Sequence, residues 1–375
     1  MSGDATAGRS FAMLLRQLND TACYTYLLGS EKTKEAILID PVLERIDHYL
    51  DEISSEGLAL RYAINTHTHA DHLSGVAAIA DRTGATAVMH RNSPSSCVEL
   101  RVDEGSKIAM GDVELEFLYT PGHTTDGVTI RTGKLLFTGD TLFIGGAGRT
   151  DLPGGDPGQH YDSLFTRIAP LPDDLLIYPA HDYRGKTSSR LGEEKQQNEY
   201  FEPRSRTQYV EWLQNRAAEA PDWMLDVLKA NYACARDPRA VWIPVDAPAC
   251  MMPNPQAVGA NEQAVRTISP DEVRDRLTVS EANRPVILDV REPEELIGPL
   301  GHLEDAVLVP VGRLPERLDE VEPYRDREII AVCKAGGRSA TAASILMQAG
   351  FAHVLSMDGG MQAWNERGFP TSGAS

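Results

Sequence analysis

The sequence predicts an α/β protein with two domains, and three observations support that prediction. Short apolar runs alternate with helix-prone segments along a chain of 375 residues, a length that suggests about two or three domains. Several of the apolar runs end directly at histidine or aspartate. Residues 244–262 contain four prolines and little periodicity, so we expect a linker over 241–263.

The first region, residues 12–240, mixes strands and helices in the way expected of sheets covered by helices. Alternating apolar residues indicate hairpin-like strands between residues 23 and 40. The helical spacing of Ile46, Leu50 and Ile53 indicates a helix over 43–57. Further strands are expected at 62–65, 85–89, 107–119, 128–131, 135–138 and 175–178, with helices beginning at Leu73 and covering 159–169.

The second region, residues 264–372, begins with Ser269 and Pro270, a pair typical of a helix start with proline in the first position. Apolar runs at 286–290, 306–310, 328–332 and 353–355 alternate with helical patterns such as 339–349. This alternation predicts a small parallel sheet.

Composition excludes some functions. Lys+Arg number 36 and Asp+Glu number 55, so the formal net charge is −19, which disfavours nucleic-acid binding. No apolar run approaches the length of a membrane span, and no export signal is apparent. The five cysteines are an odd number without close pairing. We therefore expect a reducing, cytoplasmic location and no disulfide framework.

Histidines and aspartates at strand ends are the strongest functional signal. Neutral imidazole binds metals without needing a charge, and side chains at the ends of strands can converge on one rim of the sheets. We therefore favour a metal site over a solvated, histidine-rich loop. The potential ligands are His67, His69, Asp71, His72, His123, Asp140 and His181.

This ligand set resembles the metallo-β-lactamase superfamily over residues of about 12–240, which implies an αββα sandwich. Its persulfide dioxygenase branch, of the ethylmalonic-encephalopathy type, is the closer match. The strings that carry the closer match are Leu14-Leu15-Arg16-Gln17, Thr25-Tyr26-Leu27-Leu28-Gly29, Ile39-Asp40-Pro41-Val42-Leu43-Glu44, Gly148-Arg149-Thr150-Asp151 and Ile177-Tyr178-Pro179-Ala180-His181-Asp182-Tyr183.

The resemblance implies one Fe(II) per domain, held by His67, His123 and Asp140. Two nitrogens and one carboxylate on one face are typical of non-haem iron oxygenases, and they leave positions for a sulfur ligand and O2 together. The other potential ligands would then orient these three and hold water molecules; they are His69, Asp71, His72 and His181. A two-metal site, as in thioester hydrolases of the glyoxalase II type, stays open because all seven ligands are present.

The same resemblance implies glutathione persulfide as the substrate. Arg149 and Tyr183 are the candidates to bind its glutathione part, since a guanidinium can hold a carboxylate with two hydrogen bonds. The alternative for Arg149 is an ion pair with Asp151. Cys23 and Cys97 are expected to be ordinary small residues.

Cys333 lies between a predicted strand and a predicted helix. The loop that follows resembles the active-site loop of rhodanese sulfurtransferases, in which backbone N–H groups form an anion cradle. Supporting strings are Leu288-Asp289-Val290-Arg291-Glu292, Gly301-His302-Leu303 and Asp358-Gly359-Gly360-Met361-Gln362-Ala363-Trp364.

The rhodanese resemblance covers residues of about 264–372 and implies Cys333 as the nucleophile. Lys334 and Arg338 would hold thiosulfate or sulfite, and Gly336 and Gly337 permit the close curl of the loop. Asp289 and Arg291 are expected to brace it. The alternative is a buried structural cysteine.

Together the two resemblances predict a fusion enzyme. One domain would oxidise glutathione persulfide with O2 to sulfite and glutathione, and the other would move sulfur between thiosulfate and glutathione through a persulfide of Cys333. The alternatives are a two-metal glutathione thioester hydrolase with a sulfur-handling appendage, and a non-catalytic sulfur carrier or sensor. A homodimer is possible; nucleic-acid and membrane partners are not expected.

Overall fold

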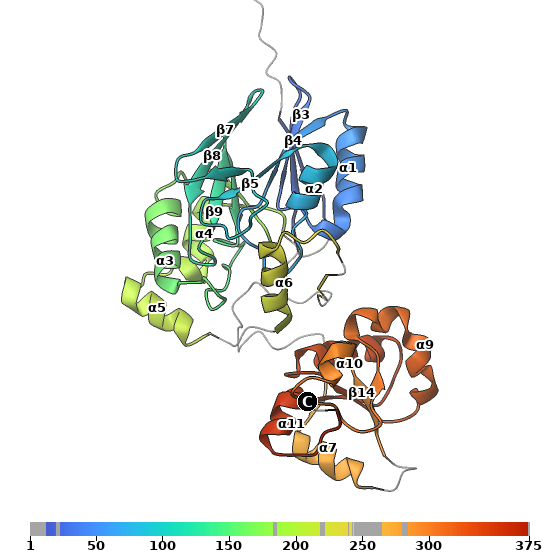
Figure 1. Cartoon of the computed structure of the whole chain (residues 1–375). Helices are drawn as coiled ribbons and strands as arrows, with labels where there is room; N and C mark the ends of the chain where they lie inside the picture. Colours follow the sequence, from blue (N-terminus) through green and yellow to red (C-terminus); the bar gives the residue numbers. More distant parts are fainter. Residues whose placement is uncertain are drawn as a thin grey trace, which may run out of the picture. The chain divides into compact units, whose positions relative to one another are not determined.

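The computed structural model of the chain describes residues 13–19, 23–182, 186–217, 222–238, 240–241, 243, 265–279 and 284–373. These residues form two compact units (Figure 1), one containing the described residues up to Val241 and one containing those from Val265 onward. Most of the predicted linker lies outside the described residues. The domain boundaries therefore stay predictions.

The first unit contains two six-stranded sheets. The first sheet has the order β1-β2-β3-β4-β5-β6 and the second has the order β12-β11-β10-β9-β8-β7. The strands of the first are β1 (Met13–Gln17), β2 (Tyr26–Ser30), β3 (Glu35–Ile39), β4 (Ala59–Ile64), β5 (Thr86–His90) and β6 (Leu100–Val102). Those of the second are β7 (Lys107–Met110), β8 (Val113–Tyr119), β9 (Val128–Thr132), β10 (Leu135–Gly139), β11 (Leu176–Pro179) and β12 (Ser189–Arg190).

Apolar side chains from both sheets form the core between them. Ile37 and Ile64 of the first sheet pack in one buried cluster with Phe117 and Phe137 of the second, because alternate residues of a strand point to the same face. A second cluster lies between the second sheet and its helices. Helices thus lie outside two packed sheets, which confirms the predicted sandwich (Figure 1).

The helices of the first unit follow from the sequence pattern with small shifts. The predicted helix over 159–169 consists of α3 followed by a π-helical segment, Ser163–Ile168. The helices are α1 (Ile46–Ser55), α2 (Val76–Thr83), α3 (Pro157–Asp162), α4 (Leu191–Gln197), α5 (Arg206–Gln214) and α6 (Asp222–Tyr232).

The second unit contains a five-stranded sheet, which is parallel throughout, as predicted. Its order is β13 (Thr267–Ile268), β17 (Val354–Met357), β16 (Ile329–Val332), β14 (Val286–Asp289) and β15 (Val307–Leu308). The helices are α7 (Pro270–Leu277), α8 (Pro293–Leu296), α9 (Leu318–Val321), α10 (Gly337–Gln348) and α11 (Gly360–Glu366). Ser269 caps α7 in a capping box with Glu272, which confirms the predicted helix start.

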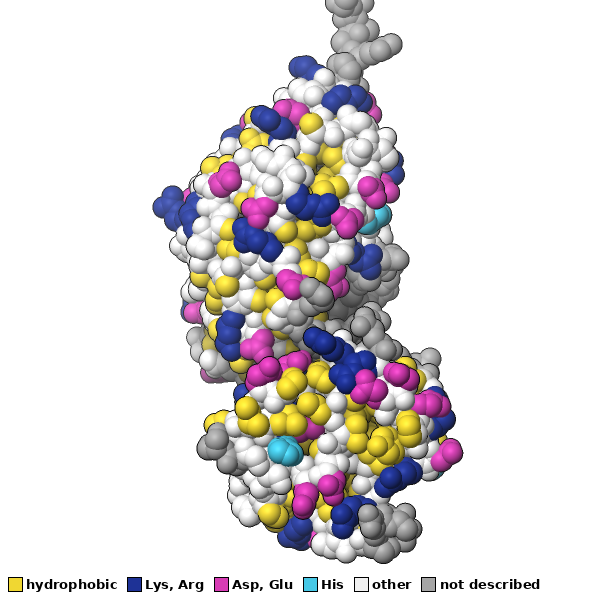
Figure 2. Space-filling view, turned by 45° about the vertical axis from the view of Figure 1, so that its right-hand side comes forward, with side chains coloured by type: hydrophobic (Ala, Val, Ile, Leu, Met, Phe, Trp, Pro, Cys, Tyr) yellow, Lys and Arg dark blue, Asp and Glu magenta, His cyan; other side chains and the backbone are white. Residues whose placement is uncertain are grey.

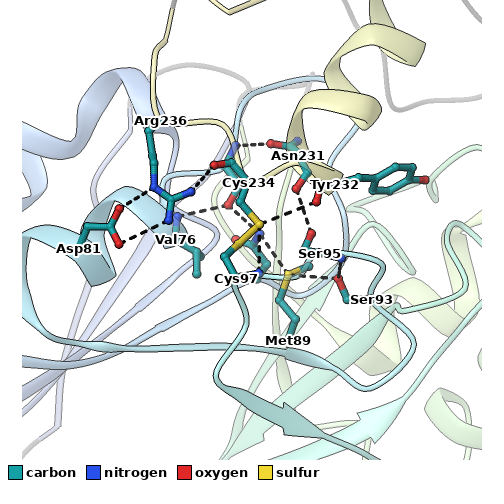
Figure 3. Close-up of a disulfide and its surroundings, with 12 residues drawn as sticks. Val76, Asp81, Met89, Ser93, Ser95, Cys97, Asn231, Tyr232, Cys234 and Arg236 are labelled. Atoms are coloured by element: carbon teal, nitrogen blue, oxygen red, sulfur yellow. Dashed lines mark hydrogen bonds and ion pairs between the residues drawn. A yellow bond between two sulfur atoms is a disulfide. The ribbon is translucent and has the colours of Figure 1, made fainter.

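Two of the cysteines form a disulfide that the sequence did not predict. Cys97 and Cys234 form a disulfide across a sequence separation of 137 residues (Figure 3). The expectation that Cys97 is an ordinary small residue was therefore wrong, and the expectation of no disulfide framework did not anticipate this bond. Spacing in the sequence could not reveal the pair because only the fold brings the two residues together. In the chain-entropy model, closing so long a loop contributes about 4–5 kcal/mol to stability.

The surface agrees with the acidic composition. Figure 2 shows basic and acidic side chains intermixed on the face that it draws, without a continuous basic area of the kind that binds nucleic acid. Among the described residues, no helix is long and apolar enough to cross a membrane.

Candidate metal centre and cysteine loop

Three predicted ligands converge at one rim of the two sheets. His67 follows β4, Asp140 follows β10, and His123 lies in the turn between β8 and β9. The ligand atoms of these three buried residues all lie within 4.8 Å of one another. Asp140 Oδ2 is 3.8 Å from His67 Nε2 and 3.5 Å from His123 Nε2. Two ligands about 2.1 Å from one metal lie about 3.0–3.4 Å apart, so small movements accommodate a cation.

The atoms that face this centre have no hydrogen-bond partner among the described residues. They are His67 Nε2, His123 Nε2 and Asp140 Oδ2. A buried polar atom without a partner costs about 1–3 kcal/mol, and three of them face one point. A metal cation would satisfy all three at once, so the residues present fit the metal that the sequence predicted.

The remaining ring nitrogens are fixed by hydrogen bonds that leave Nε2 as the metal-binding atom. His67 Nδ1 is 2.9 Å from Thr66 Oγ1, whose hydroxyl donates to Asp40 Oδ2 at 2.8 Å; His67 therefore donates through Nδ1. His123 Nδ1 donates to the carbonyl oxygen of Arg149 at 2.6 Å. Such contacts select the tautomer and the ring orientation of ligand histidines.

His181 holds two carboxylates together. Its Nδ1 is 2.7 Å from Asp140 Oδ1 and its Nε2 is 2.7 Å from Asp71 Oδ2. Carboxylate oxygens accept hydrogen bonds, so both ring nitrogens of His181 are used as donors when Asp140 and Asp71 are ionised. In this arrangement both ring nitrogens of His181 are engaged without a metal, and the orienting role of His181 stays a prediction.

Asp71 is the centre of a second buried group, which also includes His72, His181 and the half-buried Cys23. His72 Nδ1 and Cys23 Sγ are each 3.1 Å from Asp71 Oδ2. Because these atoms already bond to one another, the group is largely satisfied without a metal. His72 Nε2 and Asp71 Oδ1 lack partners among the described residues, so a second metal remains the alternative to test.

Electrostatics separate His67 from His72. Burial, together with the neighbouring His69, lowers the pKa of His67 to about 3, so its imidazole is in the neutral form that binds metals. Burial acts in the same direction on His72, but the Asp71 carboxylate outweighs it and raises the pKa of His72 to about 10. His72 is therefore a cation paired with Asp71 at neutral pH.

Three buried polar side chains that the sequence analysis did not single out hold the metal-binding segment, residues 66–74. Asp40 accepts from Thr66 N at 2.7 Å and from His69 Nε2 at 3.1 Å. Asp126 accepts from Thr68 N and Thr68 Oγ1 at 3.2 and 2.6 Å. Asn231 holds the later part of the segment. Asp40 could have been noticed as an aspartate directly after a strand, but nothing in the sequence pattern indicated Asn231.

The predicted glutathione contacts have different outcomes. Arg149 is buried, and its guanidinium makes a two-point ion pair with Asp151, with Nε 2.6 Å from Oδ1 and Nη2 3.1 Å from Oδ2. This is the alternative named for Arg149, and a glutathione role for it stays a proposal. Tyr183 lies outside the described residues.

In the second unit, Cys333 lies between β16 and α10, where the sequence predicted it. Its side chain is buried, with 1% exposed, and Gly336 N donates to its Sγ at 3.0 Å. Ser339 Oγ is 3.4 Å from the same sulfur. Gly336 has a φ of 101°, a conformation that side chains other than glycine rarely adopt, and this turn directs its N–H toward the thiol.

The segment that begins at Gly359 and Gly360, just after β17, forms hydrogen bonds with the cysteine loop. Met361 N donates to the carbonyl oxygen of Cys333 at 2.8 Å, and Gln362 N donates to that of Lys334 at 2.9 Å. Gly360 has a φ of 55°, and a Cβ there would lie 2.4 Å from the Cys333 oxygen. Only glycine therefore allows this close approach.

The predicted anion-binding residues flank the loop. Arg338 is half-buried and forms a two-point ion pair with Glu295 of α8. Its Nη1 is 2.6 Å from Glu295 Oε2 and its Nη2 is 2.7 Å from Glu295 Oε1. Lys334 is also half-buried, and Gly337 is exposed at the first turn of α10. An anion that binds to Arg338 must therefore compete with Glu295 or share the guanidinium with it.

Arg291 and Asp289 form a buried ion pair, which leads to a stability prediction; their bracing of the Cys333 loop stays a prediction. Arg291 is fully buried, pairs with Asp289 at 2.6 Å and donates to the carbonyl oxygen of Gly301 at 2.8 Å. Arg291→Met leaves a buried charge unpaired, so we expect a loss of about 3–5 kcal/mol in the free energy of unfolding. Urea-dependent hydrogen exchange of β14 and β16 in the full chain measures it.

The matched control is Arg317→Met. Arg317 pairs with Glu320 at the surface, so that replacement should change the free energy of unfolding by no more than about 0.5 kcal/mol. Equal effects of the two replacements would contradict the stabilising role of the buried Arg291–Asp289 pair.

Each of the two units matches a known protein family. The model of the metallo-beta-lactamase superfamily matches residues 18–181 and that of the rhodanese-like domain matches residues 269–367. The persulfide dioxygenase ETHE1 of Mus musculus is 39% identical over 230 residues, 59% of this chain and 89% of that protein. The crystal structure of ETHE1 from Myxococcus xanthus superposes with a TM-score of 0.57 and 40% identity, covering 59% of this chain and 99% of that one.

A hydroxyacylglutathione hydrolase from a Polaromonas species is also similar, with 39% identity over 168 residues, 43% of this chain and 62% of that protein.

The sheets and the buried imidazole–carboxylate cluster place the first unit in a class of metal-binding proteins built on a two-sheet sandwich. The chain belongs to the metallo-beta-lactamase superfamily, in the family of the ETHE1 persulfide dioxygenases, and carries a C-terminal rhodanese-like domain. The resemblances used in the sequence analysis are thereby confirmed for both units, and they assign the chain to sulfur metabolism.

Proposed function

We propose that the first unit is an iron-dependent dioxygenase that converts glutathione persulfide, O2 and water to glutathione and sulfite. The observation that carries this proposal is the set of three unbonded, buried ligand atoms of His67, His123 and Asp140, which face one point. The similarity to ETHE1 persulfide dioxygenases supports the substrate and the metal.

His67, His123 and Asp140 would hold one Fe(II), which supplies electrons to O2 and a binding position for the persulfide sulfur. The hydrogen bonds that His67 donates to Thr66 and His123 donates to the Arg149 carbonyl oxygen keep both imidazoles turned toward the centre before the substrate arrives. His181 holds protons between Asp140 and Asp71. Burial of these side chains excludes bulk water from the reacting sulfur.

The second unit is proposed to transfer sulfane sulfur between thiosulfate and glutathione. The thiolate of Cys333 attacks the outer sulfur of thiosulfate, the S–S bond breaks, and sulfite leaves with its electron pair. Glutathione thiolate then takes the sulfur from the Cys333 persulfide and regenerates the thiolate. The Gly336 N–H, which already donates to Cys333 Sγ, would stabilise the anionic sulfur in both steps.

The two reactions share glutathione persulfide and sulfite, which accounts for the fusion of the units. In the thiosulfate-consuming direction the rhodanese would supply the substrate of the dioxygenase. Arg149 is proposed to bind glutathione by exchanging part of its ion pair with Asp151 for a substrate carboxylate. A cytoplasmic location and a homodimer stay predictions from the sequence.

A two-metal thioester hydrolase is the competing function, because the Polaromonas relative is named a hydroxyacylglutathione hydrolase. One experiment separates the two. Oxygen consumption with glutathione persulfide, hydrolysis of S-lactoylglutathione and metal content are measured on one sample of the full chain. We expect oxygen uptake, about one iron per chain and no hydrolysis. Two metals per chain with thioester hydrolysis would replace the proposal, and no oxygen uptake would favour a sulfur carrier or sensor.

A further inference from the structure

The disulfide lies close to the metal-binding segment, although neither cysteine touches a proposed ligand. Cys97 is in the connection between β5 and β6, and Cys234 follows the end of α6 by two residues. Cys97 is half-buried and follows the exposed Ser96, while Cys234 is 7% exposed. Cys97 is therefore the more accessible of the two cysteines.

Asn231, in the last turn of α6, uses its whole amide group on the metal-binding segment. Its Nδ2 donates to the carbonyl oxygens of His69 and His72 at 2.8 and 2.9 Å, and its Oδ1 accepts from Ser74 N at 2.9 Å. The segment is neither helix nor strand there. Its buried backbone groups therefore depend on such partners.

The disulfide holds the end of α6 from which Asn231 projects (Figure 3). Cys234 N donates to the Asn231 carbonyl oxygen at 3.1 Å, and Cys97 N is 3.2 Å from Cys234 Sγ. Ser95 Oγ, from the Cys97 connection, also donates to the Asn231 carbonyl oxygen at 3.0 Å. Asn231 is thus bonded on its side chain to the metal-binding segment and on its backbone to the disulfide region.

The backbone at Cys234 depends on outside support. Cys234 has a φ of 57° at the helix end, a position that glycine usually occupies. The nearby ion pair of Arg236 with Asp81 is solvent-exposed, and such pairs stabilise weakly. The disulfide therefore adds a covalent constraint to the hydrogen bonds and buried side chains that hold this end of α6.

We propose that Asn231 is a positioning residue for the metal-binding segment and that the Cys97–Cys234 disulfide makes its action depend on the thiol–disulfide state of the surroundings. Two molecules of a low-molecular-weight thiol such as glutathione reduce the bond. The first attacks one cysteine sulfur, forms a mixed disulfide and frees the other cysteine; the second attacks the small-molecule sulfur of the mixed disulfide and frees the remaining cysteine thiol. Two cysteine thiols and one small-molecule disulfide form, with two electrons transferred. The end of α6 then loosens, and with it the hold on His69, His72 and Ser74.

The first test compares oxidised and reduced protein. In metal-free full-length protein, reduction should speed hydrogen exchange of the amides of residues 67–74; in metal-loaded protein it should speed metal loss to a chelator by about 10-fold or more. Cys97→Ser should show both effects without reductant and no further change with it, which removes any direct effect of the reductant on the metal. Cys250→Ser should behave as the unchanged chain.

A double-mutant cycle tests the role of Asn231. Asn231→Ala should speed metal loss to at least the extent of Cys97→Ser, and the double variant should be no faster than Asn231→Ala alone, because both changes remove one connection. Independent, multiplying effects would overturn the proposal, as would unchanged exchange of residues 67–74 after reduction. The exchange measurement needs neither the metal nor the reaction. This inference rests on the proposed metal centre. Unchanged hydrogen exchange after reduction would overturn the inference and leave the proposed function intact, whereas absence of oxygen uptake would overturn the proposed function and leave the exchange result intact.

Discussion

Replacement of His123 by alanine is expected to remove the metal from the first unit and to lower persulfide-dependent oxygen consumption by more than about 100-fold. Loss of an outer partner of a metal ligand typically costs 10–100-fold, and loss of one of three ligands costs more. The atom removed, His123 Nε2, is one of the three atoms of the proposed iron ligands that have no partner among the described residues. Metal content and oxygen uptake, measured on one sample, give the result.

Two further histidines make this experiment decisive between one metal and two. His48→Ala is the matched control, because His48 is exposed and belongs to neither group of possible metal ligands; it should leave metal content and oxygen uptake unchanged. His72 pairs with Asp71 and is not one of the three proposed iron ligands. The His72→Ala variant should therefore keep about one metal per chain. If the wild-type protein binds two metals and His72→Ala loses one of them, the single-iron assignment is wrong.

Replacement of Cys333 by serine should abolish thiosulfate sulfurtransfer and leave oxygen consumption with supplied glutathione persulfide unchanged. Serine keeps the size of the side chain and the approach of the Gly336 N–H, but its alcohol is not ionised at neutral pH and cannot carry the sulfur. Cyanide-dependent thiocyanate formation from thiosulfate measures transfer, and an oxygen electrode measures the other reaction.

The coupled assay adds a second outcome for Cys333→Ser. With thiosulfate and glutathione as the only sulfur sources, the unchanged chain should consume oxygen, and the variant should not. Cys250→Ser controls for loss of a thiol elsewhere and should behave as the unchanged chain. A collapse of oxygen uptake with supplied persulfide in Cys333→Ser would show that the two sites are not separable.

Much of the fold followed from local patterns in the sequence. Alternating apolar residues gave the strands of the sandwich, such as β8 (Val113–Tyr119), because the side chains of a strand point alternately to opposite faces. Continuous apolar runs gave the buried strands of the second unit, such as β16. Ser269 and Pro270 marked a helix start for a local reason, the capping of the first turn.

The candidate metal residues were predictable because each lies at a strand end or in a turn between strands, and strand ends of packed sheets meet at one rim. The sequence could not show the hydrogen-bond partners or the pKa of each of these side chains. His67 and His72 look equivalent in the sequence. In the structure burial lowers the pKa of His67 and its Nε2 has no partner among the described residues, whereas His72 is paired with Asp71, which raises its pKa.

The sequence by itself determined sheets covered by helices in the first unit and a small parallel sheet in the second, because both depend on local periodicity. The two named folds, the ligand set and the cysteine loop followed from the resemblance of short motifs to known families. The tertiary structure decided which ligand atoms lack partners, that His181 joins two carboxylates, and that Arg149 pairs with Asp151. It also decided that Cys97 meets Cys234 and that Asn231 bonds to His69 and His72. These contacts join residues 41 to 162 positions apart, apart from the local Arg149–Asp151 pair. Their energies depend on burial and distance, which only the folded chain creates.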